Sequence, residues 1–191
     1  MIIGITGGTG CGKTTALQVF GEMGGVVLDC DDIYHTLLKT DHTLLDAISH
    51  RFPGTVSQEG LDRKKLGAVV FADPAALSDL NTITHSAVKQ EVLRQICHES
   101  RPVAIDAIGL FEGGLAELCD HTVAVTAPEE SRVERLMHRE GISSEYANSR
   151  IAAQRSQAGF ADLCDYVLCN DGTQEQFREK CLAFFKGLGI M

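Results

Sequence analysis

The sequence lacks any stretch apolar enough to span a bilayer, and its start, Met-Ile-Ile-Gly-Ile-Thr, has no basic segment, no long apolar segment and no small-residue cleavage site. A secretory leader needs these features, so we interpret the start as mature sequence. A transmembrane helix needs about 20 mainly apolar residues. We therefore expect no membrane partner.

The cysteines include no C-x-x-C pair, and their number, seven, is odd. This pattern argues against both a disulfide framework and a zinc ribbon, and it favours a cytoplasmic location. Free cysteine is usually a small buried hydrophobe, which is what we expect of these seven. They are Cys11, Cys30, Cys97, Cys119, Cys164, Cys169 and Cys181.

Basic residues are in deficit, with 17 Lys and Arg against 26 Asp and Glu, and the formal net charge is −9 at pH 7. Nucleic acids and membrane surfaces are polyanions, so binding either would oppose the mean field of this chain. A small-molecule partner is favoured, and it can still be anionic if a few arginines and backbone N–H groups gather in one cleft. We expect no nucleic-acid partner and at most weak association of a monomer.

Short, nearly all-apolar runs alternate with segments of helical period, which predicts an α/β fold with a five-stranded parallel sheet between helices. The chain of 191 residues is long enough for one such core with appendages. The strands should be buried on both faces. They are expected at Ile2–Thr6, Val26–Asp29, Val103–Asp106, Thr122–Thr126 and Tyr166–Cys169.

Two stretches interrupt this single domain, whose core we place at about residues 1–32, 102–128 and 164–191. Residues 33–101 show helical spacing and no clear strand, which predicts a helical acceptor-binding lobe. Residues 129–163 are Arg-rich and predict a small helical lid, with a helix stop at Gly141 and an N-cap near Ser143. The apolar stripe of the last helix, residues 174–186, indicates core packing.

Residues 7–14, Gly-Gly-Thr-Gly-Cys-Gly-Lys-Thr, match the phosphate-loop pattern G-x-x-x-x-G-K-S/T directly after a strand and before an expected helix at Thr15–Met23. Glycines let backbone N–H groups point inward at an anion, and the helix N-terminus adds partial positive charge. Lys13 should reach the β- and γ-phosphates of ATP, and Thr14 should offer its hydroxyl to Mg²⁺. The expected nucleotide contacts are Gly8, Thr9, Gly10, Cys11, Gly12, Lys13, Thr14 and Thr15.

This loop alone does not separate a kinase from a GTPase switch or a motor. Asp106-Ala107-Ile108-Gly109 fits D-x-x-G superficially, but no N-K-x-D or T-K-x-D guanine-binding motif occurs near the later strands. Asp106 is either the carboxylate that helps to hold Mg²⁺ through water or an ordinary strand-terminal aspartate.

Asp29-Cys30-Asp31-Asp32 ends the second expected strand, at the sheet edge where parallel strands place their carboxyl ends. A hydroxyl that attacks a γ-phosphate must lose its proton, and Asp31 is the preferred base. The alternative is that the cluster caps the following helix, through Asp31 or Asp32.

Further motifs follow in order along nearly the whole chain, and with the phosphate loop they resemble the dephospho-CoA kinase family. They are D-C-D at 29–31, G-L-D-R at 60–63, F-A-D-P at 71–74, L-N-x-x-x-H at 80–85, D-A-I-G-L-F-E at 106–112, R-x-x-x-R at 135–139, R-I-A-A-Q at 150–154 and C-D-Y-V-L-C-N-D-G at 164–172.

The resemblance implies ATP-dependent phosphorylation of the ribose 3′-hydroxyl of dephospho-CoA, with Mg²⁺, to give CoA and ADP. It implies that Asp31 is the base and that Arg139 is the lid arginine that stabilises the transferring phosphoryl group. It places Arg63, His85, Glu112, Arg150 and Gln154 with the substrate, and Asn170 and Gly172 beside the adenine of ATP. A kinase of another small hydroxyl or nucleoside acceptor is the alternative, and a nucleotide-binding switch is a third reading.

The sequence departs from the family pattern at two places. Ile108-Gly109 stand where the family usually has Pro-Leu, which changes the expected backbone path toward Glu112. Phe160 stands where a basic residue is common, so one phosphate or lid contact is missing or is supplied by Arg155.

Overall fold

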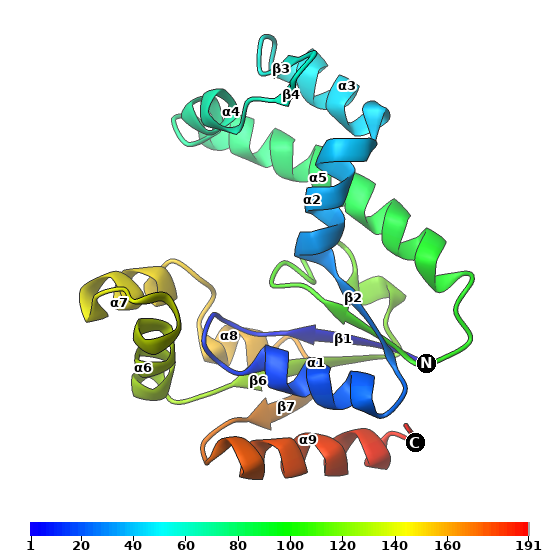
Figure 1. Ribbon diagram of the computed structural model, residues 1–191, viewed down its shortest axis with the longest axis vertical. Helices are drawn as coiled ribbons and strands as arrows, with labels where there is room; N and C mark the ends of the chain where they lie inside the picture. Colours follow the sequence, from blue (N-terminus) through cyan, green and yellow to red (C-terminus); the bar gives the residue numbers. More distant parts are fainter. Residues whose placement is uncertain (191) are drawn as a thin grey trace. The chain divides into compact units, whose positions relative to one another are not determined.

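The computed structural model describes residues 1–190, and the chain divides into two compact units. The first unit contains Met1–Leu28, Glu99–Leu110 and the chain from Ala116 onward. The second contains Asp29–His98 and Phe111–Leu115. Figure 1 labels the helices and strands of both. No helix within residues 1–190 is both long and apolar enough to cross a membrane.

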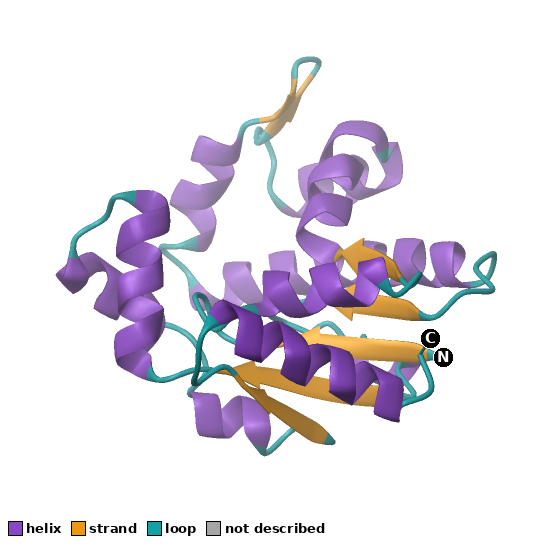
Figure 2. Ribbon diagram, turned by 60° about the horizontal axis from the view of Figure 1, so that its bottom comes forward, coloured by secondary structure: helices purple, strands orange, loops and turns teal. Residues whose placement is uncertain are grey.

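A five-stranded parallel sheet has the strand order β2-β5-β1-β6-β7. Figure 2 shows its strands side by side with helices around them. The predicted strands are confirmed, and the single difference in bounds is that β6 begins at His121, which pairs with Ile3 of β1. The strands are β1 (Ile2–Thr6), β2 (Val26–Asp29), β5 (Val103–Asp106), β6 (His121–Thr126) and β7 (Tyr166–Cys169).

Helices α1 (Lys13–Glu22) and α9 (Gln174–Gly187) pack together over this sheet. The rings of Phe20 and Phe185 meet edge to face, with their centroids 5.3 Å apart, within a cluster of buried apolar side chains. The apolar stripe of α9 is therefore core, as predicted. Helix α1 begins two residues before the predicted Thr15 because Gly12, in the left-handed region at φ 105°, is already its N-cap.

The Arg-rich stretch forms α6 (Glu129–Glu140) and α7 (Ser144–Ala152), whose contact buries Leu136 and Ala147. The predicted stop and cap are confirmed: Gly141 ends α6 at φ 66°, and the Ser143 hydroxyl accepts from the Tyr146 N–H at 3.2 Å.

A third, short helix, α8 (Gln157–Ala161), was not predicted. It lies beside β6, where the Gln157 side-chain oxygen accepts from the Ala127 N–H at 2.7 Å. Phe160 of α8 is buried. At this position, where the family commonly has a basic residue, the side chain therefore packs in the interior and makes no charged contact.

The second unit is mainly helical, with α5 packed against the other three helices. The expectation of no strand there was wrong, because Val56–Ser57 and Gly60–Leu61 pair as a two-stranded antiparallel hairpin, β3 and β4. Strands of two residues are too short to show a period in the sequence. The helices are α2 (Cys30–Thr40), α3 (His42–Arg51), α4 (Arg63–Val70) and α5 (Pro74–Ile96).

Asp165 joins the starts of β6 and β7. Its carboxylate accepts from the N–H and the hydroxyl of Thr122, both at 2.8 Å, and its N–H donates to that hydroxyl at 3.0 Å. The hydrogen bonds from Thr122, the backbone one foremost, hold the pKa of the Asp165 carboxyl below its ordinary value.

We expect Asp165→Asn to lower the free energy of unfolding by about 1 kcal/mol near neutral pH, because charge-assisted hydrogen bonds become weaker neutral ones. A depressed folded-state pKa gives a contribution that is complete above the unfolded pKa of about 3.9 and is lost as the pH falls through the folded value. Urea denaturation across this range measures it, and the difference from wild type should shrink in acid. A difference that grows on acidification contradicts the assignment. Asp162→Asn is the control, since no side-chain hydrogen bond of Asp162 occurs within residues 1–190.

Candidate functional site

The loop between β1 and α1 adopts a backbone conformation that requires glycine at position 12. Gly12 lies at φ 105°, and a Cβ there would stand 2.3 Å from the side-chain nitrogen of Asn170. The Thr15 N–H donates to the Gly12 carbonyl at 3.0 Å, which begins α1 immediately after the loop. A larger residue at position 12 would meet both backbone strain and a collision.

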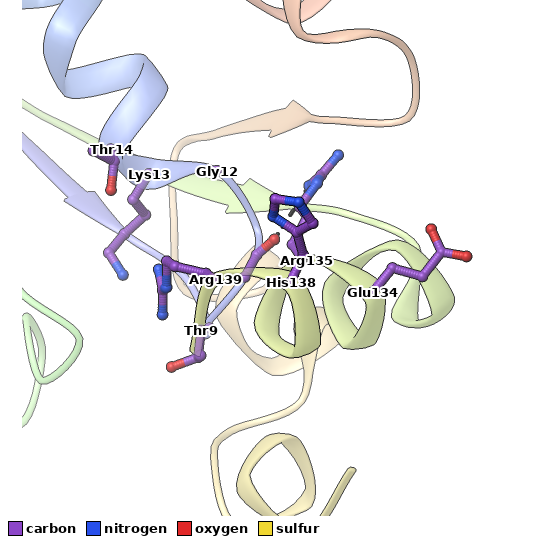
Figure 3. A pocket seen from close by; sticks show the side chains of 10 residues that line it. Thr9, Gly12, Lys13, Thr14, Glu134, Arg135, His138 and Arg139 are labelled. Carbon is purple, nitrogen blue, oxygen red and sulfur yellow. Dashed lines mark hydrogen bonds between the residues drawn. The ribbon is translucent and has the colours of Figure 1, made fainter. Parts of the chain in front are cut away.

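A cavity of about 660 Å³ lies between this loop and α6 within the first unit. In Figure 3, Lys13 and Arg139 extend toward it from its two walls, whereas Glu134 points away from the loop. Cationic side chains and a helix N-terminus around one cavity favour an anion such as a phosphate chain. The cavity is lined by Gly8, Thr9, Gly10, Gly12, Lys13, Thr14, Glu134, Arg135, His138 and Arg139.

Lys13 is already directed along the loop, because its ammonium donates to the Gly7 carbonyl at 3.0 Å. This bond holds the cation beside the cavity at the position where the sequence predicted a phosphate contact. Thr14, the next residue, is exposed on the first turn of α1. The two side chains therefore place a cation and a hydroxyl at one wall of the cavity.

A second cavity, of about 270 Å³, adjoins the loop at Gly12 and Thr15 and is also lined by Arg135, Asn170, Gln174 and Phe177. Asn170 is only 6% exposed, and its side-chain nitrogen donates to the Cys11 carbonyl at 2.9 Å. Its side-chain oxygen is buried and accepts no hydrogen bond within the described residues. An apolar ring, an amide and arginine around a small cavity suit a nucleobase, and Gly172, also predicted there, is not among the lining residues.

Three side chains from the Arg-rich stretch contact the loop backbone. Arg135 donates to the Gly10 carbonyl at 3.1 Å, and Arg132 donates to the Thr9 carbonyl at 2.8 Å. Gln154 also bonds Thr9, so the structure places this predicted substrate residue against the phosphate loop. The contacts of Arg132 and Arg135 were not predicted, although these residues stand seven and four positions before Arg139, which puts all three near one helix face.

Arg139 and Arg150 both contact the carboxylate of Glu140. These contacts, Arg139 foremost, hold the pKa of the Glu140 carboxyl below its ordinary value. Arg139 lines the larger cavity, and Arg150 does not. Glu140 therefore ties the end of α6 to α7 beside the cavity wall.

Thr14 and Asp106 offer the oxygen donors that Mg²⁺ prefers. Asp106 ends β5 and pairs in register with Ile5, two residues before the loop begins at Gly7. No cluster of three or more His, Cys, Asp or Glu side chains suited to a metal occurs in residues 1–190. The donor set fits a magnesium ion that takes most of its ligands from phosphate and water.

Cys11 lies inside the loop but is 1% exposed and belongs to the same cluster of buried apolar side chains as Phe20 and Phe185. Burial raises the pKa of its thiol. Because the thiolate is the oxidation-prone form, this cysteine is not expected to be a redox sensor.

Four predicted substrate residues belong to the second unit. Asp29, not Asp31 or Asp32, caps α2, since its carboxylate accepts from both of their N–H groups at 2.9 and 3.1 Å. The cluster therefore does cap the helix, as the alternative held, but the capping residue is Asp29 rather than Asp31 or Asp32. Asp31 is exposed in the first turn. Arg63 begins α4, His85 is half-buried on α5, and Glu112 is exposed in a turn.

The Ile108-Gly109 departure has a defined backbone position. The Ile108 carbonyl accepts from the buried Thr6 hydroxyl at 3.1 Å, which ties this segment to the end of β1. Gly109 is not among the glycines with positive φ, so its position does not require glycine conformationally. The change in sequence is thus compatible with an anchored segment after β5.

Comparison with known proteins places these features in a family. The sequence matches the family model described as dephospho-CoA kinase over residues 1–176. A curated dephospho-CoA kinase of Lactobacillus acidophilus is 34% identical over 186 residues, which cover 94% of this chain and 92% of the relative.

Solved structures show the same fold. A crystal structure from Thermus thermophilus has a TM-score of 0.83 and 30% identity, and the match covers 98% of this chain and 97% of that one. A dephospho-CoA kinase from Campylobacter jejuni has a TM-score of 0.69 and 24% identity over 100% of this chain and 98% of that one, which indicates likeness of fold.

Proposed function

The chain belongs to the dephospho-CoA kinase family, and from that premise we propose that it transfers the γ-phosphate of ATP to the ribose 3′-hydroxyl of dephospho-CoA. The products are CoA and ADP, and the reaction is the last step of coenzyme A biosynthesis. The observation that carries the proposal is the cavity of about 660 Å³ that is lined by the phosphate loop and by two arginines of α6, Arg135 and Arg139. Such a site supplies positioning and charge stabilisation, which are the main needs of phosphoryl transfer.

The loop is proposed to bind the triphosphate of ATP through Lys13 and through backbone N–H groups other than that of Thr9, which donates to Gln154. Asn170 and Gly172 are proposed to lie near the base. Lys13 is proposed to contact the β- and γ-phosphates, and Arg139 to stabilise the charge that develops on the transferring group. Both side chains line the same cavity, which supports these roles.

Thr14 and Asp106 are proposed to hold Mg²⁺, Thr14 directly and Asp106 through water. When bound, the ion neutralises phosphate charge. Thr14 is exposed beside Lys13, as a ligand to a phosphate-bound ion needs to be.

Asp31 is proposed to accept the proton of the 3′-hydroxyl. Its support is its place two residues beyond β2, its exposure, and the capping of α2 by Asp29, which leaves the Asp31 carboxylate without a capping role. Arg63, His85, Glu112 and Arg150 are proposed contacts of dephospho-CoA. We further propose that the enzyme acts in the cytoplasm as a monomer or weak homo-oligomer.

Purified protein with ATP, Mg²⁺ and a panel of acceptors tests this function. We expect ADP release that depends on dephospho-CoA and CoA formation in equal amount. Turnover with another small alcohol and none with dephospho-CoA would reassign the acceptor. A folded sample that binds ATP but transfers phosphate to no acceptor in the panel would exclude the kinase assignment.

A further inference from the structure

Every polar group of Thr9, at the tip of the phosphate loop, is bound by a side chain from the Arg-rich stretch. Its carbonyl accepts from the Arg132 Nε–H at 2.8 Å. Its N–H donates to the Gln154 side-chain oxygen at 2.8 Å, and its hydroxyl accepts from the Gln154 side-chain nitrogen at 2.9 Å. Thr9 and these two residues are separated by 123 and 145 positions in the sequence.

Arg132 is buried in the same place. It is 3% exposed, although arginine is rarely buried without partners. A Cβ on Gly8 would stand 2.4 Å from its Nη2, and a Cβ on Gly10 would stand 2.9 Å from its carbonyl oxygen. Arg132 therefore packs directly over the two glycines that flank Thr9.

Neither Arg132 nor Gln154 is among the residues that line the larger cavity. Both approach the loop from outside that cavity, so the Thr9 carbonyl is held away from the place where phosphate is proposed to bind. A carbonyl oxygen turned inward would repel a phosphate. The Thr9 N–H is also held by Gln154, so anion binding is left to the other N–H groups of the loop. Fixing Thr9 from outside favours the loop conformation that binds an anion.

We propose that Arg132 and Gln154 are positioning residues that hold Thr9, and with it the phosphate loop, in the nucleotide-binding conformation. This inference rests on the proposed function only for its kinetic consequences. Nucleotide binding itself tests it independently of the acceptor. Neither residue is proposed to touch ATP.

Three substitutions at position 132 distinguish the effect of the hydrogen bond to Thr9 from the effect of the positive charge. Gln carries a neutral N–H₂ donor the same number of bonds from Cα as Arg Nε, so Arg132→Gln keeps the hydrogen bond to Thr9 and removes the charge. Lys keeps the charge but carries no donor at that position. Met is similar in length and has neither.

We expect Arg132→Met to raise the dissociation constant of a fluorescent ATP analogue and the KM for ATP by about 10-fold, the effect of losing about one good hydrogen bond at the loop. The KM for dephospho-CoA should stay within about 2-fold of wild type. Arg132→Gln should restore most of the nucleotide affinity, and Arg132→Lys should not. Gln154→Leu, which removes both remaining contacts, should weaken nucleotide binding in the same direction.

Arg178→Met is the matched control, because Arg178 is a partly exposed arginine of α9 that pairs with Glu22. It should leave nucleotide affinity unchanged. Normal nucleotide affinity in folded Arg132→Met, Arg132→Lys and Gln154→Leu alike would overturn the proposal, as would rescue by lysine but not by glutamine. If wild type binds ATP but does not phosphorylate dephospho-CoA, the proposed function fails while the binding comparison still decides this inference.

Discussion

Replacing Lys13 with methionine is expected to lower kcat/KM for ATP by about 10³-fold, which is the largest effect expected of any single substitution in this chain. Lys13 is proposed to bind the transferring phosphate in a cavity that also includes Arg135 and Arg139. Its contribution should grow as charge moves onto the phosphoryl group, so kcat should fall as well as affinity. Initial rates at varied ATP, with dephospho-CoA saturating, measure both.

The matched variant is Lys13→Arg, which keeps the charge but replaces a compact ammonium with a planar fork. We expect it to recover only part of the loss. Lys13 also donates to the Gly7 carbonyl, so thermal unfolding of both variants is needed to show that the loop still folds. A folded Lys13→Met protein with turnover within about 10-fold of wild type would contradict the proposed role.

Replacing Asp31 with asparagine is expected to lower kcat by at least about 10²-fold, the usual contribution of a general base. Asparagine is close in size and cannot accept the proton. ATP affinity should be unchanged, because no role in nucleotide binding is proposed for Asp31. Single-turnover transfer and equilibrium binding of an ATP analogue separate the two quantities.

Asp32→Asn is the control for Asp31, because both residues are exposed in the first turn of α2 and both donate their N–H to the Asp29 carboxylate. It should cost little activity. Equal losses in the two variants would indicate an effect on the helix start rather than on a base, and would return Asp31 to a structural role.

The sheet and the phosphate loop could be predicted because their signals are local. Burial on both faces leaves little choice of residue in an inner strand such as Val103–Asp106, which is nearly all apolar. The expected burial was wrong for the edge strand β7, where Tyr166 and Val167 are exposed. The loop needs glycine at Gly12 because of its own φ of 105°. Gly141 and Ser143 likewise mark a helix end and a helix start by chemistry within a few residues.

The features that the sequence did not predict depend on contacts between distant positions. Arg132 lies on a polar helix, where sequence alone makes an arginine a solvated residue, yet it is buried against Thr9, 123 positions away. Gln154 was expected to contact the substrate, but in the structure its side-chain oxygen accepts a hydrogen bond from the Thr9 N–H. The β3-β4 hairpin was missed because two-residue strands have no readable period.

Following the γ-phosphate itself is the most direct test of the central claim. ATP carrying a label on that group is incubated with Mg²⁺, dephospho-CoA and the enzyme, and the position of the label in the product is determined by mass spectrometry and phosphorus NMR. We expect the label on the ribose 3′-oxygen of CoA with wild type, and about 10³-fold slower labelling with Lys13→Met. Label that appears only as inorganic phosphate, or at any other position of the acceptor, would contradict the proposed reaction.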